Sequence, residues 1–155
     1  MCLGAVAGQG VTMDLAYLAT PLLAWLAAGG LKFAINSIRS GTAAFGLIGY
    51  GGLPSNHSAI VSSMATLVGL REGIGHPAFG VALTLAFIVV LDAHSLRRQI
   101  GRQAEAINKL TGSSPESQPL RERLGHGRLE IAAGIAVGAA VALVVQLVLG
   151  PAVSV

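Results

Sequence analysis

Charged residues are scarce in this sequence: Asp, Glu, Lys and Arg together make up 11% of its 155 residues. Soluble domains contain about 25% charged residues, so this scarcity excludes an ordinary water-soluble domain. Hydrophobic residues make up 53% of the chain, and the mean hydropathy is +0.70. The composition therefore predicts an integral membrane protein, and the length allows one domain, residues 1–155.

Cysteine is also scarce. Cys2 is the only one, which excludes an intramolecular disulfide and a thiolate metal cluster. No other grouping of residues resembles a metal site, and we expect no metal and no cofactor. The pI of about 9.6 would favour nucleic acid in a soluble protein. Here the arginines lie beside apolar segments, so we expect membrane lipids and not nucleic acid as partners.

Four apolar segments stand out: Leu15–Leu31, Ser58–Leu70, Pro77–Leu91 and Ile131–Leu149. No basic stretch precedes the first segment, so we expect it to be retained and not removed as a signal peptide. A full span needs about 20 apolar residues, and the second segment is short and carries the hydroxyls of Ser62, Ser63 and Thr66. Because of these hydroxyls, we expect the segment Ser58–Leu70 to face protein more than lipid. In the fourth segment, the spacing of Gly134 and Gly138 lets another helix approach closely.

Two further stretches complete the expected fold. Residues 41–53 are apolar but hold five glycines, which favours a re-entrant segment covered by protein. From Arg97 to Leu110 the apolar residues recur at helical spacing, which predicts an amphipathic helix on the bilayer surface. The fold class is therefore all-α: a polytopic membrane bundle of about four spans, with a Gly-rich re-entrant segment and an interfacial amphipathic helix.

Four spans of alternating direction bring the chemically interesting residues to one membrane face. These residues flank the ends of successive apolar segments, and they are Lys32, Arg39, His57, Arg97, Arg98 and His126. The same face carries nine of the ten Lys and Arg residues, with only Arg71 opposite. By the positive-inside rule this face is cytoplasmic, or stromal in a plastid membrane.

Two histidines lie in short polar motifs. His126 precedes Glu130 by four residues, so on a helix the carboxylate would lie below the imidazole, fix its tautomer and make it a better nucleophile. His57 stands near the start of the second segment and suits a general acid. Together with fixed positive charge, two imidazoles fit chemistry on a phosphate ester.

The other candidates would bind the phosphate. Backbone amides around Ser55 and Asn56 precede a helix and favour an anion, while Lys32 and Arg39 supply positive charge. Each feature also has a structural interpretation. Pro-Ser at a helix start is ordinary capping, basic residues after a span usually contact headgroups, and His76 and His94 are interpreted as structural.

In this order the motifs resemble the type 2 phosphatidic acid phosphatase superfamily, which includes vanadium haloperoxidases, and most closely its divergent bacterial and plastid branch. Three motifs carry the resemblance: Gly-Gly-x-Pro-Ser-x-His-Ser-Ala at 51–59, Asp-Ala-x-x-x-Arg-Arg-x-x-Gly-x-Gln-Ala at 92–104, and Leu-Gly-His-x-x-x-Glu at 124–130. The similarity covers roughly residues 20–145.

The resemblance implies a helical fold and metal-independent hydrolysis of a phosphomonoester through a phosphohistidine. It implies that His126 is the nucleophile, Glu130 its orienting partner and His57 the acid, while Lys32, Arg39 and Ser55 bind phosphate. The superfamily's second phosphate-binding arginine lies six residues before the nucleophile, where this chain has Leu120. Arg121 is one residue away from that position, but Arg97 or Arg98 is the preferred replacement, because the end of a helix is a firmer platform than the loop after Pro119.

Two functions therefore stay open. The favoured one is a membrane phosphatase acting on a lipid monophosphate such as a phosphatidate, phosphatidylglycerophosphate or polyprenyl phosphate, in a bacterial inner membrane or a plastid membrane. The alternative is a non-catalytic relative that binds or moves an anionic lipid. A haloperoxidase is disfavoured because the chain has little room for a substrate domain. Four spans make a thin bundle, which favours a homodimer.

Overall fold

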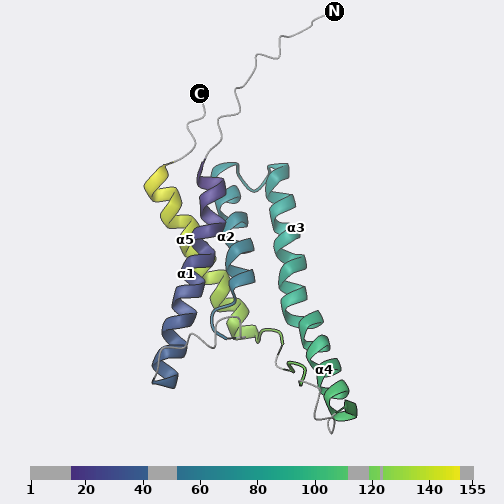
Figure 1. The fold of residues 1–155 in the computed structure, drawn as a ribbon. Helices are drawn as coiled ribbons and strands as arrows, with labels where there is room; N and C mark the ends of the chain where they lie inside the picture. The colour runs from purple at the N-terminus through teal and green to yellow at the C-terminus, as the bar shows by residue number, and fades with distance from the viewer. Residues whose placement is uncertain (1–14, 42–51, 112–118, 123, 151–155) are drawn as a thin grey trace, which may run out of the picture.

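The computed structural model describes residues 15–41, 52–111, 119–122 and 124–150, and the regular structure in these ranges is entirely helical (Figure 1). This confirms the all-α prediction. The elements, in chain order, are α1 (Leu15–Ser40), α2 (Asn56–Arg71), α3 (Pro77–Leu91), the π-helical turn η2 (Asp92–Leu96), α4 (Arg97–Thr111) and α5 (Arg128–Leu149). The predicted re-entrant stretch falls largely on residues 42–51, which lie outside the described residues.

The short helix α2 forms the centre of the bundle and packs against α1, α3 and α5 (Figure 1). Its seven buried residues include Leu67, which is fully buried. This confirms that the second apolar segment faces protein. Three helical segments of the described chain are long and apolar enough to cross a membrane, and α2 is not among them. With 16 residues it spans about 24 Å, less than the ~30 Å hydrocarbon core of a bilayer.

Two glycines of α5 allow it to approach α2 closely. A Cβ built on Gly138 would lie 2.2 Å from the carbonyl oxygen of Ala59, and one on Gly134 would lie 2.4 Å from that of Ser55. No real side chain tolerates such a distance, so only glycine fits at these two positions. The expectation of a tight helix contact at this pair is confirmed, and its partner is α2.

Helices α3 and α4 are parts of one continuous helical segment, Pro77–Thr111, with the turn η2 between them. Its 35 residues correspond to about 52 Å, well beyond the ~30 Å bilayer core. Figure 1 shows α4 continuing in the direction of α3. The predicted amphipathic helix therefore exists, with Gly101 and Ala104 buried, but it extends from a span where a separate helix was expected. Its position at a bilayer surface stays a prediction.

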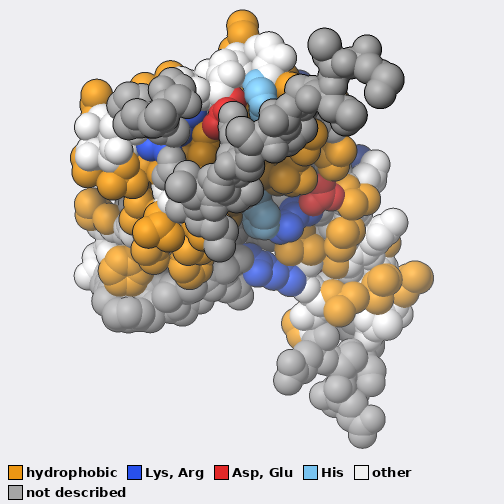
Figure 2. All heavy atoms as spheres, turned by 90° about the horizontal axis from the view of Figure 1, so that it is seen from above, with side chains coloured by type: hydrophobic (Ala, Val, Ile, Leu, Met, Phe, Trp, Pro, Cys, Tyr) orange, Lys and Arg blue, Asp and Glu red, His pale blue; other side chains and the backbone are white. Residues whose placement is uncertain are grey.

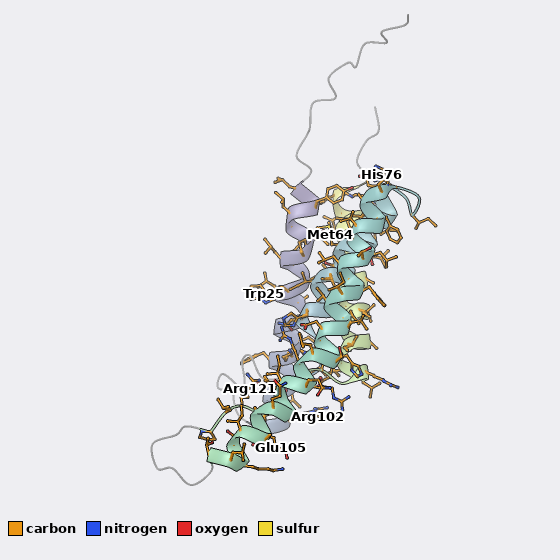
Figure 3. All side chains as sticks on the ribbon, turned by 90° about the vertical axis from the view of Figure 1, so that its right-hand side faces the viewer. Trp25, Met64, His76, Arg102, Glu105 and Arg121 are labelled. Carbon is orange, nitrogen blue, oxygen red and sulfur yellow. The ribbon has the colours of Figure 1, made fainter. Side chains whose placement is uncertain are left out.

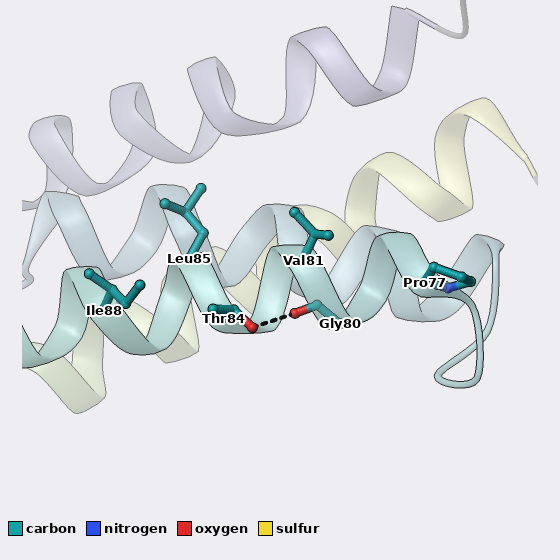
Figure 4. Close-up of a pocket in the computed structure, with 6 residues that line it drawn as sticks. All are labelled: Pro77, Gly80, Val81, Thr84, Leu85 and Ile88. Atoms are coloured by element: carbon teal, nitrogen blue, oxygen red, sulfur yellow. Dashed lines mark hydrogen bonds between the residues drawn. The ribbon is translucent and has the colours of Figure 1, made fainter.

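Many large hydrophobic side chains of the described residues are exposed, and they cover much of the face seen in Figure 2, as expected of a protein surrounded by lipid. None of the α3 residues is buried. One face of α3 carries a shallow groove of about 480 Å³ (Figure 4), which is lined by Pro77, Gly80, Val81, Thr84, Leu85 and Ile88. All six belong to α3, so no other described helix covers this face.

His76 lies at the end of the bundle opposite Arg102 and Glu105 on α4 (Figure 3). Arg71 is the last residue of α2, five positions before His76. Arg71 joins α2 to α5, donating to Oε1 of Gln146 at 2.7 Å and to the carbonyl of Gly150 at 2.7 Å. Nδ1 of His76 accepts a hydrogen bond from the amide of Ala78 and caps α3. Both residues thus have structural roles, as was expected for His76.

Candidate functional site

His57 and His126 meet at one end of the bundle, although 69 positions separate them in the sequence. Their ring centroids are 6.0 Å apart and the rings are inclined at 68°. His57 belongs to the first turn of α2, and His126 lies in the segment just before α5. The convergence that alternating helix directions predicted therefore brings these two imidazoles together.

Backbone hydrogen bonds hold the segment that carries His126. Its amide donates to the carbonyl of Ala93 in η2 at 3.0 Å, and its carbonyl lies 3.4 Å from Nδ1 of His94. A π-helical turn displaces carbonyls from the regular i→i−4 ladder, which makes an acceptor such as Ala93 available. The amide of Ser55 donates to the carbonyl of Glu130 at 2.9 Å and so ties the two histidine motifs together.

Arg97 is the arginine that reaches the histidines. Its Nη2 lies 3.1 Å from Nε2 of His57, and its Nε lies 3.5 Å from a carboxylate oxygen of Asp92. A guanidinium only donates hydrogen bonds, so Nε2 of His57 accepts and the ring carries its proton on Nδ1. Asp92 holds Arg97 in place, because a carboxylate and a guanidinium attract at this distance.

Burial and the neighbouring positive charges favour the neutral form of His126. Burial lowers the pKa of the ring, the positive charge of Lys32 lowers it further, and Glu130 opposes these effects. The His126 residue is only 7% exposed. Lys32, in the second half of α1, interacts electrostatically with Glu130 as well as with both histidines. A neutral imidazole is the form that can act as a nucleophile.

The predicted geometry of Glu130 was wrong. Helix α5 begins at Arg128, so His126 is not on the helix and the four-residue spacing does not put the carboxylate below the ring. Instead, Oε2 of Glu130 accepts from the amide of Gly127 at 2.9 Å and caps α5. Nδ1 of His126 has no hydrogen-bond partner among the described residues. In this structure Glu130 acts on His126 through its charge.

Ser55 and Asn56 differ in what they offer to a ligand. Ser55 is fully buried and caps α2: its Oγ accepts from the amide of Ser58 at 3.3 Å and from that residue's hydroxyl at 3.0 Å. The backbone amide of Ser55 donates a hydrogen bond to the carbonyl of Glu130, so this amide is not part of an anion cradle. The side chain of Asn56 has a buried Oδ1 without a partner in the described chain. Phosphate binding by either residue stays a prediction.

Two predicted phosphate ligands do not join the histidine pair. Arg39 is exposed in the last turn of α1 and forms no hydrogen bond or ion pair with a described residue. Arg98 is exposed, and its Cγ lies beside Gly125, where a Cβ would be only 2.9 Å away. Leu120 stands at the position of the superfamily's arginine. Its backbone amide and carbonyl form hydrogen bonds with the side-chain amide of Asn108.

Sequence reasoning missed one participant near the pair. Asp92 was given no role, yet its carboxylate lies 3.5 Å from Nε of Arg97. Its signal was available, because Asp92 opens the Asp-Ala-x-x-x-Arg-Arg motif. His94 was interpreted as structural, and its contact with the backbone carbonyl of His126 fits that interpretation. The π-helical turn that orients them was not predictable from apolar periodicity.

An apolar groove of about 400 Å³ lies between α2 and α3, with Ile135 of α5 also contributing. It begins near the histidines: Val61 and Ser62 of its lining are about one helical turn beyond His57, and Val90 lies two residues before Asp92. Its remaining lining residues are Ala65, Thr66, Phe79, Leu83, Ala86 and Phe87. The groove is large and apolar enough to take part of a hydrocarbon chain.

These features define a class: an all-helical membrane protein with two imidazoles and a guanidinium at one end of the bundle. Residues 13–141 match the model of the family described as the Divergent PAP2 family. The chain belongs to this family, which confirms the resemblance found in its motifs. It is 34% identical over 110 residues to the uncharacterized membrane protein YuiD of Bacillus subtilis (strain 168), over 61% of this chain and 70% of that protein. No solved structure matches the chain significantly.

Proposed function

We propose that this protein hydrolyses a phosphomonoester of a membrane lipid through a phosphohistidine formed on His126. The observation that carries the proposal is the meeting of His57, His126 and Arg97, with ring centroids 6.0 Å apart and the guanidinium 3.1 Å from a ring nitrogen. Membership of the divergent family supports the same chemistry.

The reaction has two steps. A ring nitrogen of His126 attacks phosphorus, the bond to the lipid oxygen breaks, and His57 gives that oxygen a proton. Water then attacks the phosphohistidine, His57 takes a proton from it, and inorganic phosphate leaves. Lys32 and Arg97 stabilise the charge on the transferring group. Nε2 of His57 accepts a hydrogen bond from Arg97, so it cannot hold a proton while that contact lasts. The phosphate oxygens of the substrate must therefore first draw the guanidinium away from His57.

The lipid nature of the substrate is supported by the surface of the chain. Three helical segments of the described residues are long and apolar enough to span a membrane, and the apolar groove between α2 and α3 begins about one turn from His57. A phosphate at the histidines with its hydrocarbon chain in this groove fits a phosphatidate, a phosphatidylglycerophosphate or a polyprenyl phosphate. A free sugar phosphate would leave the groove without a role.

One observation favours the alternative, a non-catalytic protein that binds an anionic lipid. The carboxylate of Glu130 caps α5 and does not bond to the ring of His126, so the ring lacks the hydrogen bond that would orient a nucleophile. Binding alone does not require two adjacent imidazoles, and for this reason we favour the enzyme.

The test is turnover by purified protein on a panel of lipid monophosphates, with EDTA present and with vanadate as a mimic of the transition state. We expect phosphate release that EDTA leaves unchanged and vanadate inhibits. His126→Ala should reduce the rate by about 10³-fold or more, and His76→Ala, at the opposite end, serves as the control. Binding of the lipids without turnover would support the alternative. A strict requirement for magnesium or zinc would contradict the proposed mechanism.

A further inference from the structure

A basic pocket, separate from the histidine pair, lies beside the segment that carries His126. Its volume is about 180 Å³, and five polar residues line it: His94, Ser95, Arg98, Gln99 and Arg102. The imidazole and the two guanidiniums recur every four residues, so they share one face of the continuous helical segment. The neighbouring arginines 97 and 98 therefore serve different places, one at the histidine pair and the other in this pocket.

Among the described residues, no carboxylate pairs with the positive charge of the pocket. Neither guanidinium of the pocket forms an ion pair with a described residue, whereas Arg97 is paired with Asp92 and Lys109 with Glu105. Like charges four residues apart on a helix repel each other. An anion bound between Arg98 and Arg102 would remove this repulsion and accept hydrogen bonds from both guanidiniums.

The level of the pocket along the helix identifies the kind of anion. The apolar helix α3 ends at Leu91, and His94 follows about 4.5 Å further along the axis at 1.5 Å per residue. The headgroup layer on each side of a hydrocarbon core is roughly 5–8 Å thick. With the edge of the hydrocarbon core set at Leu91, the last apolar residue of α3, the pocket begins at the depth at which the phosphates of membrane lipids lie.

The pocket also touches the segment that positions the candidate nucleophile. Nδ1 of His94 lies 3.4 Å from the carbonyl of His126, and the stem of Arg98 packs against Gly125, whose φ is +95°. A ligand that fixes His94 and Arg98 would therefore restrict the backbone on which His126 is carried.

We propose that this pocket binds the phosphate of an anionic phospholipid, distinct from the substrate, and that the bound lipid holds the His126 segment in its working position. Binding is independent of the proposed function, while the effect on His126 rests on it. The lipid is a structural ligand and is not consumed.

Phosphatidylglycerol is a suitable probe, because it is a phosphodiester and lacks the monoester that the proposed reaction cleaves. Native mass spectrometry of the detergent-solubilised protein would count bound phosphatidylglycerol against phosphatidylcholine. Arg98→Gln/Arg102→Gln removes two positive charges from the pocket. Lys109→Gln/Arg128→Gln removes two charges outside it and is the matched control.

We expect the pocket variant to bind phosphatidylglycerol about 10-fold more weakly, and the control variant less than about threefold more weakly. Equal binding by the pocket variant, or an equal loss in both variants, would overturn the proposal. In vesicles, phosphatidylglycerol should raise the turnover of the wild type and not that of the pocket variant. Absence of turnover in every protein would refute the proposed function and leave the binding result intact.

Discussion

Arg97 and His57 form the contact on which the site depends, with Nη2 of the arginine 3.1 Å from Nε2 of the histidine. The arginine comes from the start of α4 and the histidine from the first turn of α2. Nothing in the local sequence around either residue places them together. The contact follows from the antiparallel course of α2 and α3 together with the turn η2, which sets the direction of Arg97.

Replacement of Arg97 tests whether it substitutes for the arginine that the superfamily has where this chain has Leu120. Arg97→Gln should lower kcat/KM by about 10²-fold or more, because it removes a bidentate charged donor from the transferring phosphoryl group. Arg97→Lys should recover part of the loss, since it keeps the charge without the fork. Arg128→Gln, on the same face but outside the site, is the control. Wild-type kinetics of Arg97→Gln would remove this residue from the mechanism.

The pH profile tests the electrostatic environment of His126. Burial and Lys32 lower the pKa of its ring, and Glu130 acts in the opposite direction. A nucleophile must be neutral, so the acid limb of kcat/KM should lie below the ordinary pKa of histidine, about 6.5.

Two variants should move this limb in opposite directions. Lys32→Met removes a positive charge, raises the pKa of His126 and moves the limb to higher pH. Glu130→Gln removes a negative charge and moves it to lower pH, while the amide can still cap α5. The position of the limb is the readout, because the rate also reflects phosphate binding. Movement of the acid limb in the same direction in both variants would contradict the assignment of His126.

Helix packing gives a prediction that does not depend on function. Gly138→Ala should destabilise the protein by about 1–3 kcal/mol, because its Cβ would lie 2.2 Å from the carbonyl oxygen of Ala59. Gly80→Ala is the matched control: nothing lies within 4 Å of its Cβ, and alanine is the better helix former. Thermal unfolding in detergent measures both. Equal stability of Gly138→Ala and the wild type would mean that α2 and α5 are further apart than described.

The sequence predicted the all-helical class, the buried second segment and the meeting of His57 with His126, because apolar periodicity and alternating direction determine them. It did not predict where α5 begins, and a shift of two residues was enough to take His126 off the helix. The sequence also did not predict which of Arg97 and Arg98 reaches the histidines. Neighbouring side chains on a helix point about 100° apart, and the π-helical turn η2 before them changes the direction in which each one points.

The distribution of basic residues predicts the membrane face on which the site opens. Nine of the ten Lys and Arg residues flank the same ends of the apolar segments as the histidines, and Arg71 lies at the other end beside Glu72. The positive-inside rule therefore predicts a cytoplasmic or stromal site. Single cysteines in a Cys2→Ser background test it, with Ala106→Cys on α4 and Ile74→Cys between α2 and α3, both at exposed positions.

An impermeant maleimide added outside intact bacterial cells should label Ile74→Cys and spare Ala106→Cys. Permeabilised cells should label both and so control for reactivity. Labelling of Ala106→Cys alone in intact cells would invert the orientation. The assignment of His126 and His57 would survive that inversion, because their geometry does not depend on the direction of insertion. The substrate, however, would then have to be a lipid phosphate exposed on the outer leaflet, and the anionic phospholipid at Arg98 and Arg102 would have to come from that leaflet too.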